Sequence, residues 1–376
     1  MDLSQVFTEL TKGFANLSIG SVVMIVAGCV LVYLAIAKEY EPVLLLPIGI
    51  GCVIANIPMT GMTGPEGLFT TLYDAGIKNE LFPLLIFIGV GAMIDFSPLL
   101  SQPKMVLLGA AGQFGIFGTL LLATLLGFPL NEAASIGVIG AIDGPTSIFV
   151  ASKLAPNLLA PIAVAAYSYM SLIPIIQPPI MKLMTTKRER LVHMEYAPRP
   201  ISKGALIAFP IVVTLVVGII VPDAVPLISM LMLGNLLKES GVVDRLNKAA
   251  QNEIINIATL FLGLTIGSTM TADRFLSWST LAVLGLGLIA FALDTVAGLF
   301  FGKVMCWLSG YKINPLIGAA GISAFPMAGR LAARMAQDED FENFILMHAM
   351  GANTAGQLGS VAAGGVLLAL VSGVLT

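Results

Sequence analysis

The stretch Gly137-Val-Ile-Gly140-Ala-Ile-Asp143-Gly144-Pro145-Thr146-Ser147 places an acidic residue inside an apolar segment, at a point where a helix cannot continue regularly. Pro lacks an N–H and Gly tolerates unusual dihedral angles, so the Gly144–Pro145 pair predicts a helix break. A carboxylate in hydrocarbon is costly and usually marks an ion or proton pathway. The alternative is a structural kink with a neutral, hydrogen-bonded Asp143.

A second stretch, Gly318-Ala-Ala-Gly321-Ile-Ser323-Ala-Phe-Pro326, repeats the pattern G-x-x-G-x-x-x-x-P of the first. Two interrupted apolar segments at matching places in two halves of a chain are the best sequence signal of a transport site. The freed carbonyls of such breaks, together with a carboxylate, suit a hard monovalent cation. Irregular backbone of this kind is tolerated in a membrane only where it lines a cavity or is buried in protein.

The amino-acid composition determines the class of protein. The chain has 376 residues, of which 57% are hydrophobic and only 11% charged, whereas soluble domains have about 25% charged residues. The sequence therefore predicts an all-α polytopic membrane protein. We expect about 11 transmembrane helices in two related, inverted repeats with paired broken helices. The net charge of −3 offers no basic field for nucleic acid, and three scattered cysteines form no metal motif or disulfide framework.

The chain divides into four parts: an N-terminal segment with the first helix (residues 1–40), repeat 1 (41–184), a basic loop (185–204) and repeat 2 (205–376). Both halves contain a short apolar run, a polar link and a Gly-rich span in the same order. The links are residues 67–80 and 240–253. Inverted repeats require an odd number of membrane crossings between equivalent helices. The apolar runs of this sequence do not give such a number cleanly, so we expect at least one run not to cross the membrane fully.

The loop 185–204 carries Lys187, Arg188, Arg190, Arg199 and Lys203. A loop this dense in positive charge is expected to be cytoplasmic. It is either a solvated linker or a docking surface for a soluble partner.

Three residues at the second break are candidates for binding. Asn314 and Ser323 offer neutral oxygens, and Arg330 follows Pro326 by one helical turn. A guanidinium at this depth needs an anion or carbonyl partners, which favours a role in binding an anionic substrate or in gating. The alternative is that Arg330 snorkels to the membrane interface.

The helices after the breaks carry further polar groups. Tyr169 is placed to relay a proton, and four residues are candidate cation ligands: Asn353, Thr354, Gln357 and Ser360. The alternative is that these side chains join helices through hydrogen bonds, beside small residues that permit close packing.

Asp294 lies in another apolar segment, Phe291-Ala-Leu-Asp294-Thr-Val-Ala-Gly298, without a helix break. A structural hydrogen bond is the favoured interpretation, with a second ion site as the rival. The sequence contains no nucleophile elbow, no phosphate-binding glycine loop and no zinc spacing.

Five segments together resemble the β subunit of the sodium-pumping biotin-dependent decarboxylases, a family that includes oxaloacetate, methylmalonyl-CoA, glutaconyl-CoA and malonate decarboxylases. The segments are GAIDGPTSIFVASKLAP (140–156), AAYSYMSLIPIIQPPIMK (165–182), MLMLGNLLKESGVVDRL (230–246), NPLIGAAGISAFPMAGR (314–330) and HAMGANTAGQLGSVAAGG (348–365). The compact chain is more similar to the methylmalonyl-CoA and glutaconyl-CoA types than to the longer oxaloacetate type.

The resemblance implies a membrane subunit that decarboxylates carboxybiotin, consumes a periplasmic proton and exports Na+. Its implied partners are biotin carrier and carboxyltransferase subunits, a small membrane subunit, lipid and further copies of the chain, in the bacterial inner membrane. Carboxybiotin is then presented by a partner rather than bound covalently. A stand-alone secondary transporter, such as a Na+/H+ antiporter or a Na+-coupled organic-anion carrier, is the alternative class.

The family's motifs carry over onto Asp143, Tyr169, Asn314, Gly318, Ser323, Arg330 and Asn353. We expect catalytic roles for Asp143, Tyr169 and Arg330, and contacts with carboxybiotin from Arg330 and Asn314. The expected Na+ ligands are Asp143, Asn353, Ser323, Asn314, Gly318 and Thr354. Na+ and a proton would exclude each other on Asp143, and this competition would couple the two flows.

Overall fold

The computed structural model describes residues 11–195 and 200–375, and within these ranges the chain contains no strand. Arg199 of the basic loop lies outside the described residues. The elements of the first half are α2 (Ile19–Ala37), α3 (Pro42–Ala55), α4 (Leu68–Leu72), η1 (Tyr73–Ile77), α5 (Leu81–Met93), α6 (Ser97–Ser101), η2 (Pro103–Met105), α7 (Val106–Ala111), α8 (Phe114–Leu125), α9 (Leu130–Gly137), η3 (Val138–Ala141), α10 (Gly144–Leu154), η4 (Pro156–Leu158), α11 (Leu159–Ser171) and α12 (Ile173–Met184).

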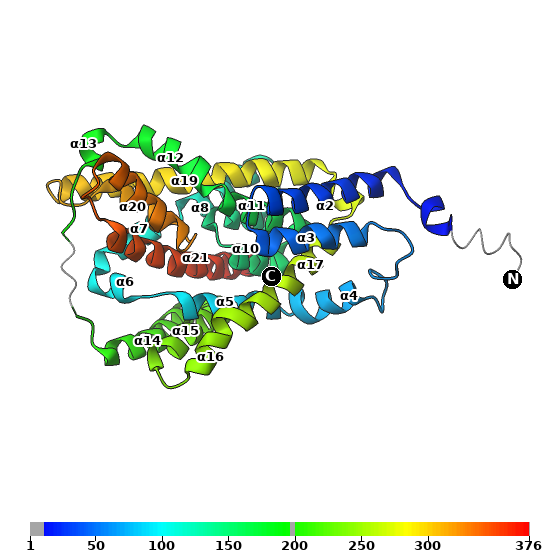
Figure 1. Ribbon diagram of the computed structural model, residues 1–376, viewed down its shortest axis with the longest axis horizontal. Helices are drawn as coiled ribbons and strands as arrows, with labels where there is room; N and C mark the ends of the chain where they lie inside the picture. Colours follow the sequence, from blue (N-terminus) through cyan, green and yellow to red (C-terminus); the bar gives the residue numbers. More distant parts are fainter. Residues whose placement is uncertain (1–10, 196–199, 376) are drawn as a thin grey trace, which may run out of the picture.

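A four-residue helix, α13 (Lys187–Arg190), forms part of the basic loop. The elements of the second half are α14 (Lys203–Ile220), η5 (Pro222–Ala224), α15 (Val225–Ser240), α16 (Asp244–Ala249), η6 (Ala250–Ile254), α17 (Ile255–Ser268), α18 (Ala272–Phe275), α19 (Trp278–Leu308), η7 (Pro315–Gly321), α20 (Met327–Glu339) and α21 (Leu346–Leu375). In Figure 1, α13 and α2 mark opposite ends of the long axis, and α21 lies between the outer helices.

Six helices of the described chain are long and apolar enough to cross a membrane, and the number rises to eight if each of two bent pairs is one span. The predicted count of about eleven is not confirmed. A straight span needs about 20 residues, whereas α3 has 14 and the two broken helices are divided into shorter pieces. The outer helices α2 and α14 are apolar but largely exposed, as expected for lipid-facing surfaces.

The two halves interlock through reciprocal helix contacts. The short helix α3 packs against α17 of the second half, and the corresponding short helix α15 packs against α5 of the first half. Each predicted polar link also contains a π-helix, η1 in one and η6 in the other. Equivalent parts of the two halves therefore make equivalent contacts across the molecule.

A small apolar cluster lies where the two halves meet at their breaks. It contains Ile142 from the first break, Ile322 and Ala324 from the second, and Phe291 from α19. The polar centre around Asp143 lies among helices whose apolar side chains form this small cluster and two larger apolar cores.

Candidate functional site: a buried carboxylate beside two meeting helix breaks

The first break lies where the sequence predicts it. The 3-10 turn η3 ends at Ala141, Ile142 adopts a left-handed conformation with φ 53, and Asp143 is extended before α10 begins. A β-branched residue at positive φ is strained, and such strain gathers at functional sites. Pro145 is tolerated in the first turn of α10 because a helix has no partner for its first N–H groups.

Asp143 caps α10 and is 95% buried, with 5% of its surface exposed. Its Oδ2 atom accepts hydrogen bonds from Thr146 Oγ1 at 2.7 Å, Gln357 Nε2 at 2.7 Å and Ser360 Oγ at 3.0 Å. Within the described residues, its Oδ1 atom accepts only a long bond of 3.4 Å, from the Thr146 backbone N–H. Donors therefore surround one oxygen, and the other has unused capacity to accept.

Within residues 11–195 and 200–375, no basic side chain forms an ion pair with Asp143. A buried carboxylate needs a counter-charge or a proton as well as hydrogen bonds. The donors from α10 and α21 stabilise its ionised form, so the centre is suited to binding a small cation.

The second break contacts the first directly. The Ser323 N–H donates to the Ala141 carbonyl at 3.3 Å, and Ser323 Oγ donates to the Gly356 carbonyl of α21 at 2.9 Å. Asn353 Nδ2 donates to the Ile322 carbonyl at 2.6 Å. The Asn353 Oδ1 atom is buried and has no hydrogen-bond partner in the part of the chain that the structure describes. A buried acceptor without a donor is a natural cation ligand.

Gly318 has a packing role in this arrangement. A Cβ atom added to Gly318 would overlap the Gly298 carbonyl of α19, and a Cβ added to Gly298 would overlap the Gly318 carbonyl. The second break therefore lies directly against α19 because neither residue has a side chain.

Several other predicted residues bond to groups other than the Asp143 carboxylate. The Tyr169 hydroxyl donates to the Leu284 carbonyl of α19. Asn314 Nδ2 donates to the carbonyls of Arg190 at 2.8 Å and Val192 at 2.9 Å, which ties η7 to the basic loop.

Two further predicted residues form no hydrogen bond with Asp143 in the described part of the chain. Thr354 Oγ1 donates to the Met350 carbonyl of its own helix at 2.8 Å. Arg330 is exposed and lines a surface cavity. Of the predicted site residues, the structure brings Ser323 and Asn353 to the junction of the breaks and leaves Arg330 and Asn314 outside it.

Two direct partners of Asp143, Gln357 and Ser360, were among the candidate cation ligands, whereas the third, Thr146, was not predicted. The spacing of all three in the sequence carries a signal. Thr146 follows Asp143 by three residues, which is the spacing of an N-cap and its partner. Asn353, Gln357 and Ser360 recur at i, i+4 and i+7, which places them on one face of a helix.

Asp294 forms a separate buried group. It is fully buried, and its Oδ1 accepts from the Gly115 N–H near the start of α8. Its Oδ2 has no hydrogen-bond partner among residues 11–195 and 200–375. The hydrogen bond agrees with the favoured structural interpretation. The unpartnered oxygen keeps the ion-site interpretation open.

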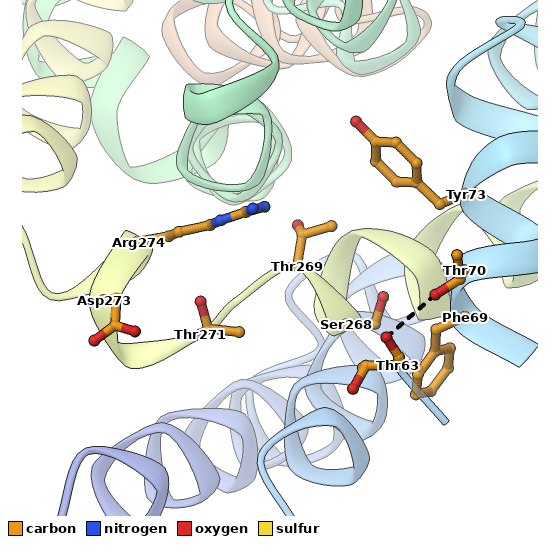
Figure 2. Close-up of a pocket in the computed structure, with 9 residues that line it drawn as sticks. All are labelled: Thr63, Phe69, Thr70, Tyr73, Ser268, Thr269, Thr271, Asp273 and Arg274. Atoms are coloured by element: carbon orange, nitrogen blue, oxygen red, sulfur yellow. Dashed lines mark hydrogen bonds between the residues drawn. The ribbon is translucent and has the colours of Figure 1, made fainter. Parts of the chain in front are cut away.

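A second cavity, of ≈ 500 Å³, lies at the end of the molecule opposite the basic loop. Figure 2 shows that hydroxyl side chains surround it and that Arg274 extends across it toward Thr269. Several of these hydroxyls bond to backbone carbonyls, as Ser268 does to Thr265 and Thr269 to Ile266. In the described chain, no lining residue bonds to Asp143, so this cavity is distinct from the buried centre.

At the basic-loop end, ion pairs join the loop to the end of α20. Arg190 pairs with Glu339 at 2.7 Å, and His193 Nε2 lies 2.7 Å from Asp340 Oδ2. The hydrogen bond with His193 holds the pKa of Asp340 below its ordinary value. The loop is therefore fixed to the helix that begins at the second break.

The fold and the buried centre define a multi-pass, all-α membrane protein with a carboxylate beside paired helix breaks. The chain belongs to the family of the Na+-transporting oxaloacetate decarboxylase beta subunit, whose model matches residues 20–371.

Similar proteins carry names from three branches of this family. The chain is 52% identical to the glutaconyl-CoA decarboxylase subunit beta of Acidaminococcus fermentans, over 96% of each chain. It is also 52% identical to the methylmalonyl-CoA decarboxylase subunit beta of Veillonella parvula, over 96% of each. Identity to the oxaloacetate decarboxylase beta chain of Klebsiella pneumoniae is 44%, over 96% of this chain and 97% of the relative. The resemblance predicted from the motifs is confirmed.

Proposed function

We propose that this chain is the membrane subunit of a Na+-translocating decarboxylase, in which it decarboxylates carboxybiotin presented by a partner subunit, consumes a proton and exports Na+. Family membership supports this function over a stand-alone secondary transporter. The observation that carries the proposal is Asp143: a buried carboxylate with four hydrogen-bond contacts and no basic partner among the described residues.

Na+ is the transported ion in this proposal, and its ligands are oxygens at the junction of the breaks. Asp143 Oδ1 has spare accepting capacity, and Asn353 Oδ1 has no hydrogen-bond partner among the residues described. Ser323 lies at the same junction. Hard monovalent and divalent cations bind such carboxylate and amide oxygens readily.

Competition between Na+ and a proton on Asp143 couples the two flows, because one carboxylate cannot bind both well. The hydrogen bonds from Gln357 and Ser360 favour the ionised form of the carboxylate, which is the form that binds Na+. Moving one charge against the membrane potential costs about 2.3 kcal/mol per 100 mV. Decarboxylation must therefore drive a conformational step, and α20 is suited to it because it begins at the second break.

In the chemical step, Arg330 holds the carboxylate of carboxybiotin and Tyr169 relays the proton. Loss of CO₂ from the N-carboxylate breaks one N–C bond, and the ring nitrogen takes up the proton. Because Arg330 is exposed, this step requires that the docked carrier exclude water from it. A dry site accelerates the loss because water no longer stabilises the anion. To relay the proton, the Tyr169 hydroxyl must first break its hydrogen bond to the Leu284 carbonyl.

We further infer two inverted repeats, about eleven crossings and a cytoplasmic loop 185–204 in the bacterial inner membrane. The reciprocal pairs α3–α17 and α15–α5 support the repeats. In Figure 1, α5 runs toward the end that carries α13, while α17 runs away from it, as inversion requires. The expected assembly contains biotin carrier and carboxyltransferase subunits, a small membrane subunit and further copies of this chain.

Radioactive Na+ uptake into inverted proteoliposomes tests the function. Vesicles with the chain and its partner subunits should accumulate Na+ only when the biotin carrier is carboxylated. Vesicles with the chain alone should show no Na+/H+ exchange. Robust exchange by the isolated chain would instead establish the stand-alone transporter.

A further inference from the structure

A polar cavity of ≈ 500 Å³ and an apolar groove of ≈ 520 Å³ adjoin each other where α19 begins. The short helix α18 contributes to both, because Asp273 and Arg274 line the polar cavity and the next residue, Phe275, lines the groove. The first turns of α19, from Trp278 to Leu284, form the rest of the groove. A polar compartment beside an apolar one suits an amphiphilic ligand.

Arg274 supplies positive charge to the polar cavity. Figure 2 shows its side chain extending across the cavity toward Thr269, whereas the Asp273 carboxylate points away from the guanidinium. In the chain as described, Arg274 forms no ion pair. Its backbone carbonyl accepts from Ser277 Oγ and Thr280 Oγ1, each at 3.3 Å, which holds α18 against the start of α19. A guanidinium held over a cavity without a carboxylate partner favours an anionic oxygen group of a ligand, such as a phosphate.

Three hydroxyl groups of the same cavity are left as acceptors. Thr70, Ser268 and Thr269 each donate their hydrogen to a backbone carbonyl, so their oxygens remain free to accept from a ligand. The hydroxyls of a glycerol headgroup supply such donors, whereas a choline headgroup has none. The polar cavity therefore fits a phosphate joined to a polyol.

The apolar groove has the features of a membrane boundary. Helix α19 is apolar and long enough to cross a membrane, and it begins at Trp278, which is 79% exposed. Tryptophan at the end of a span is typical of the interface between lipid headgroups and acyl chains. Leu276 and Leu281 are also exposed in the groove. The arrangement places an acyl chain in the groove when the headgroup occupies the cavity.

The groove also includes the helix turn that holds Tyr169. Leu284 lines the groove, and its carbonyl accepts the hydrogen bond of the Tyr169 hydroxyl. Three residues further along α19, a Cβ atom added to Gly287 would overlap the Tyr169 ring, so the ring lies directly against this helix. An occupant of the groove would therefore pack against the turn that positions this tyrosine.

We propose that the cavity and the groove together bind an anionic glycerophospholipid of the phosphatidylglycerol type, from the leaflet at the end of the molecule opposite the basic loop. Arg274 binds the phosphate, the hydroxyls of the cavity accept hydrogen bonds from the glycerol headgroup, and Trp278 and Leu281 pack against an acyl chain. A free phosphate ion shares the first of these contacts and lacks the others. The lipid supports Tyr169 through Leu284, and this last step alone rests on the proposed function.

Native mass spectrometry of the full chain in detergent, titrated with single lipids, measures the binding. The wild type should bind phosphatidylglycerol more tightly than phosphatidylcholine. Arg274→Gln should weaken binding of phosphatidylglycerol about ten-fold or more, because it removes a hydrogen bond between two charged groups. Arg274→Lys should retain most of the affinity because it keeps the charge. Trp278→Ala should weaken the binding of both lipids.

Two substitutions serve as matched controls. Arg245→Gln removes an exposed arginine of α16 that lines neither compartment, and Trp307→Ala removes the exposed tryptophan at the other end of α19. Both should leave lipid binding unchanged. The unfolding temperature of each variant in lipid-free detergent distinguishes a folding defect from a binding defect, and the comparison of lipids on the wild type needs no substitution.

Three results would overturn the lipid site. Equal affinity of the wild type and Arg274→Gln for phosphatidylglycerol rejects the phosphate contact. Equal affinity of the wild type for phosphatidylglycerol and phosphatidylethanolamine rejects the polyol headgroup. If inorganic phosphate raises the unfolding temperature as much as phosphatidylglycerol does, and equally in Trp278→Ala, the cavity takes a free anion and not a lipid.

The link to Tyr169 is tested in proteoliposomes of the assembled complex. With phosphatidylglycerol, kcat for decarboxylation of the carboxylated carrier should be about two-fold or more above its value in pure phosphatidylcholine. Arg274→Gln should remove this difference. A kcat that does not depend on phosphatidylglycerol would reject the link to Tyr169 without affecting the binding result, and Na+ uptake tests the proposed function independently of both.

Discussion

The backbone N–H of Ser323 donates a hydrogen bond to the carbonyl of Ala141, at 3.3 Å. This bond joins the second helix break to the first, two residues before Asp143. Ser323 is also bonded to Gly356 of α21, so hydrogen bonds connect the break that starts α20 both to α21 and to the loop that carries Asp143. We expect a displacement of α20 to be felt at the carboxylate.

Replacing Asp143 by Asn should abolish Na+-stimulated carboxybiotin breakdown and Na+ uptake. The amide keeps the shape of the side chain but removes the charge that binds Na+, and its NH₂ group faces the donors of Gln357 and Ser360. The measurement is decarboxylation of the carboxylated carrier against Na+ concentration.

Asp223→Asn is the control for this experiment, because Asp223 is an exposed acid outside the junction. It should leave Na+ stimulation unchanged. If Asp143→Asn keeps both stimulation and uptake, Asp143 is not the ion site.

Removing one donor from the Asp143 carboxylate should weaken Na+ binding without abolishing turnover. Ser360→Ala deletes a hydrogen bond to a charged acceptor, a type worth about 1.5–3 kcal/mol. The ionised form then becomes less stable against the protonated form. The Na+ concentration for half-maximal stimulation should rise about ten-fold or more at neutral pH, and less at alkaline pH.

The control is Thr124→Ala, which deletes an exposed hydroxyl that donates only to the Leu120 carbonyl of its own helix. A Ser360→Ala variant with the Na+ dependence of the wild type would show that Ser360 does not hold the ionised carboxylate.

Local chemistry explains why the breaks were predictable. Pro and Gly disrupt a helix wherever they occur, so Gly144–Pro145 and Pro326 identify the breaks without knowledge of the tertiary structure. The class of protein follows equally from composition, because residues exposed to lipid must be apolar. The number of crossings does not follow, since tilt and burial determine whether a 14-residue helix such as α3 spans the membrane.

The partners of Asp143 depend on long-range packing. Asn353, Thr354, Gln357 and Ser360 are all plausible ligands in sequence, but the rotation of α21 against α10 decides which of them face the carboxylate. That rotation places Gln357 and Ser360 at Asp143 and turns Thr354 toward its own helix. The spacing of i, i+4 and i+7 shows which of these residues share a face of the helix. It does not show which face points toward Asp143 until the position of one of them is known.

Gly298→Ala should destabilise the protein strongly. The added Cβ would overlap the Gly318 carbonyl at the second break, and overpacking of this kind costs about 1–3 kcal/mol or more. Gly285→Ala on the same helix meets no atom within 4 Å, so it should instead stabilise α19 by about 0.5–1 kcal/mol. The measurement is thermal unfolding in detergent. Equal effects of the two substitutions would contradict the close contact between α19 and the second break.

Acid should release the basic loop from α19 through Glu189. Glu189 forms a capping box with Thr186 and an ion pair with Lys303 of α19 at 3.4 Å. Burial alone raises the pKa of Glu189, but the hydrogen bonds from Thr186 and the charge of Lys303 outweigh burial and hold the pKa below its ordinary value. For an acid with a lowered pKa in the folded state, the stabilisation is complete above the unfolded pKa of about 4.3 and is lost as the pH falls through the folded value.

The difference in unfolding temperature between the wild type and Glu189→Gln isolates this contribution, because Asp340 titrates in both proteins. The difference should be constant between about pH 5 and 7 and should shrink below about pH 4.3. Lys303→Gln should reduce the difference at neutral pH, because it removes the charge that stabilises the ionised carboxylate. A difference that does not change on acidification would mean that Glu189 acts only as a neutral helix cap, and that its charge does not hold the loop against α19.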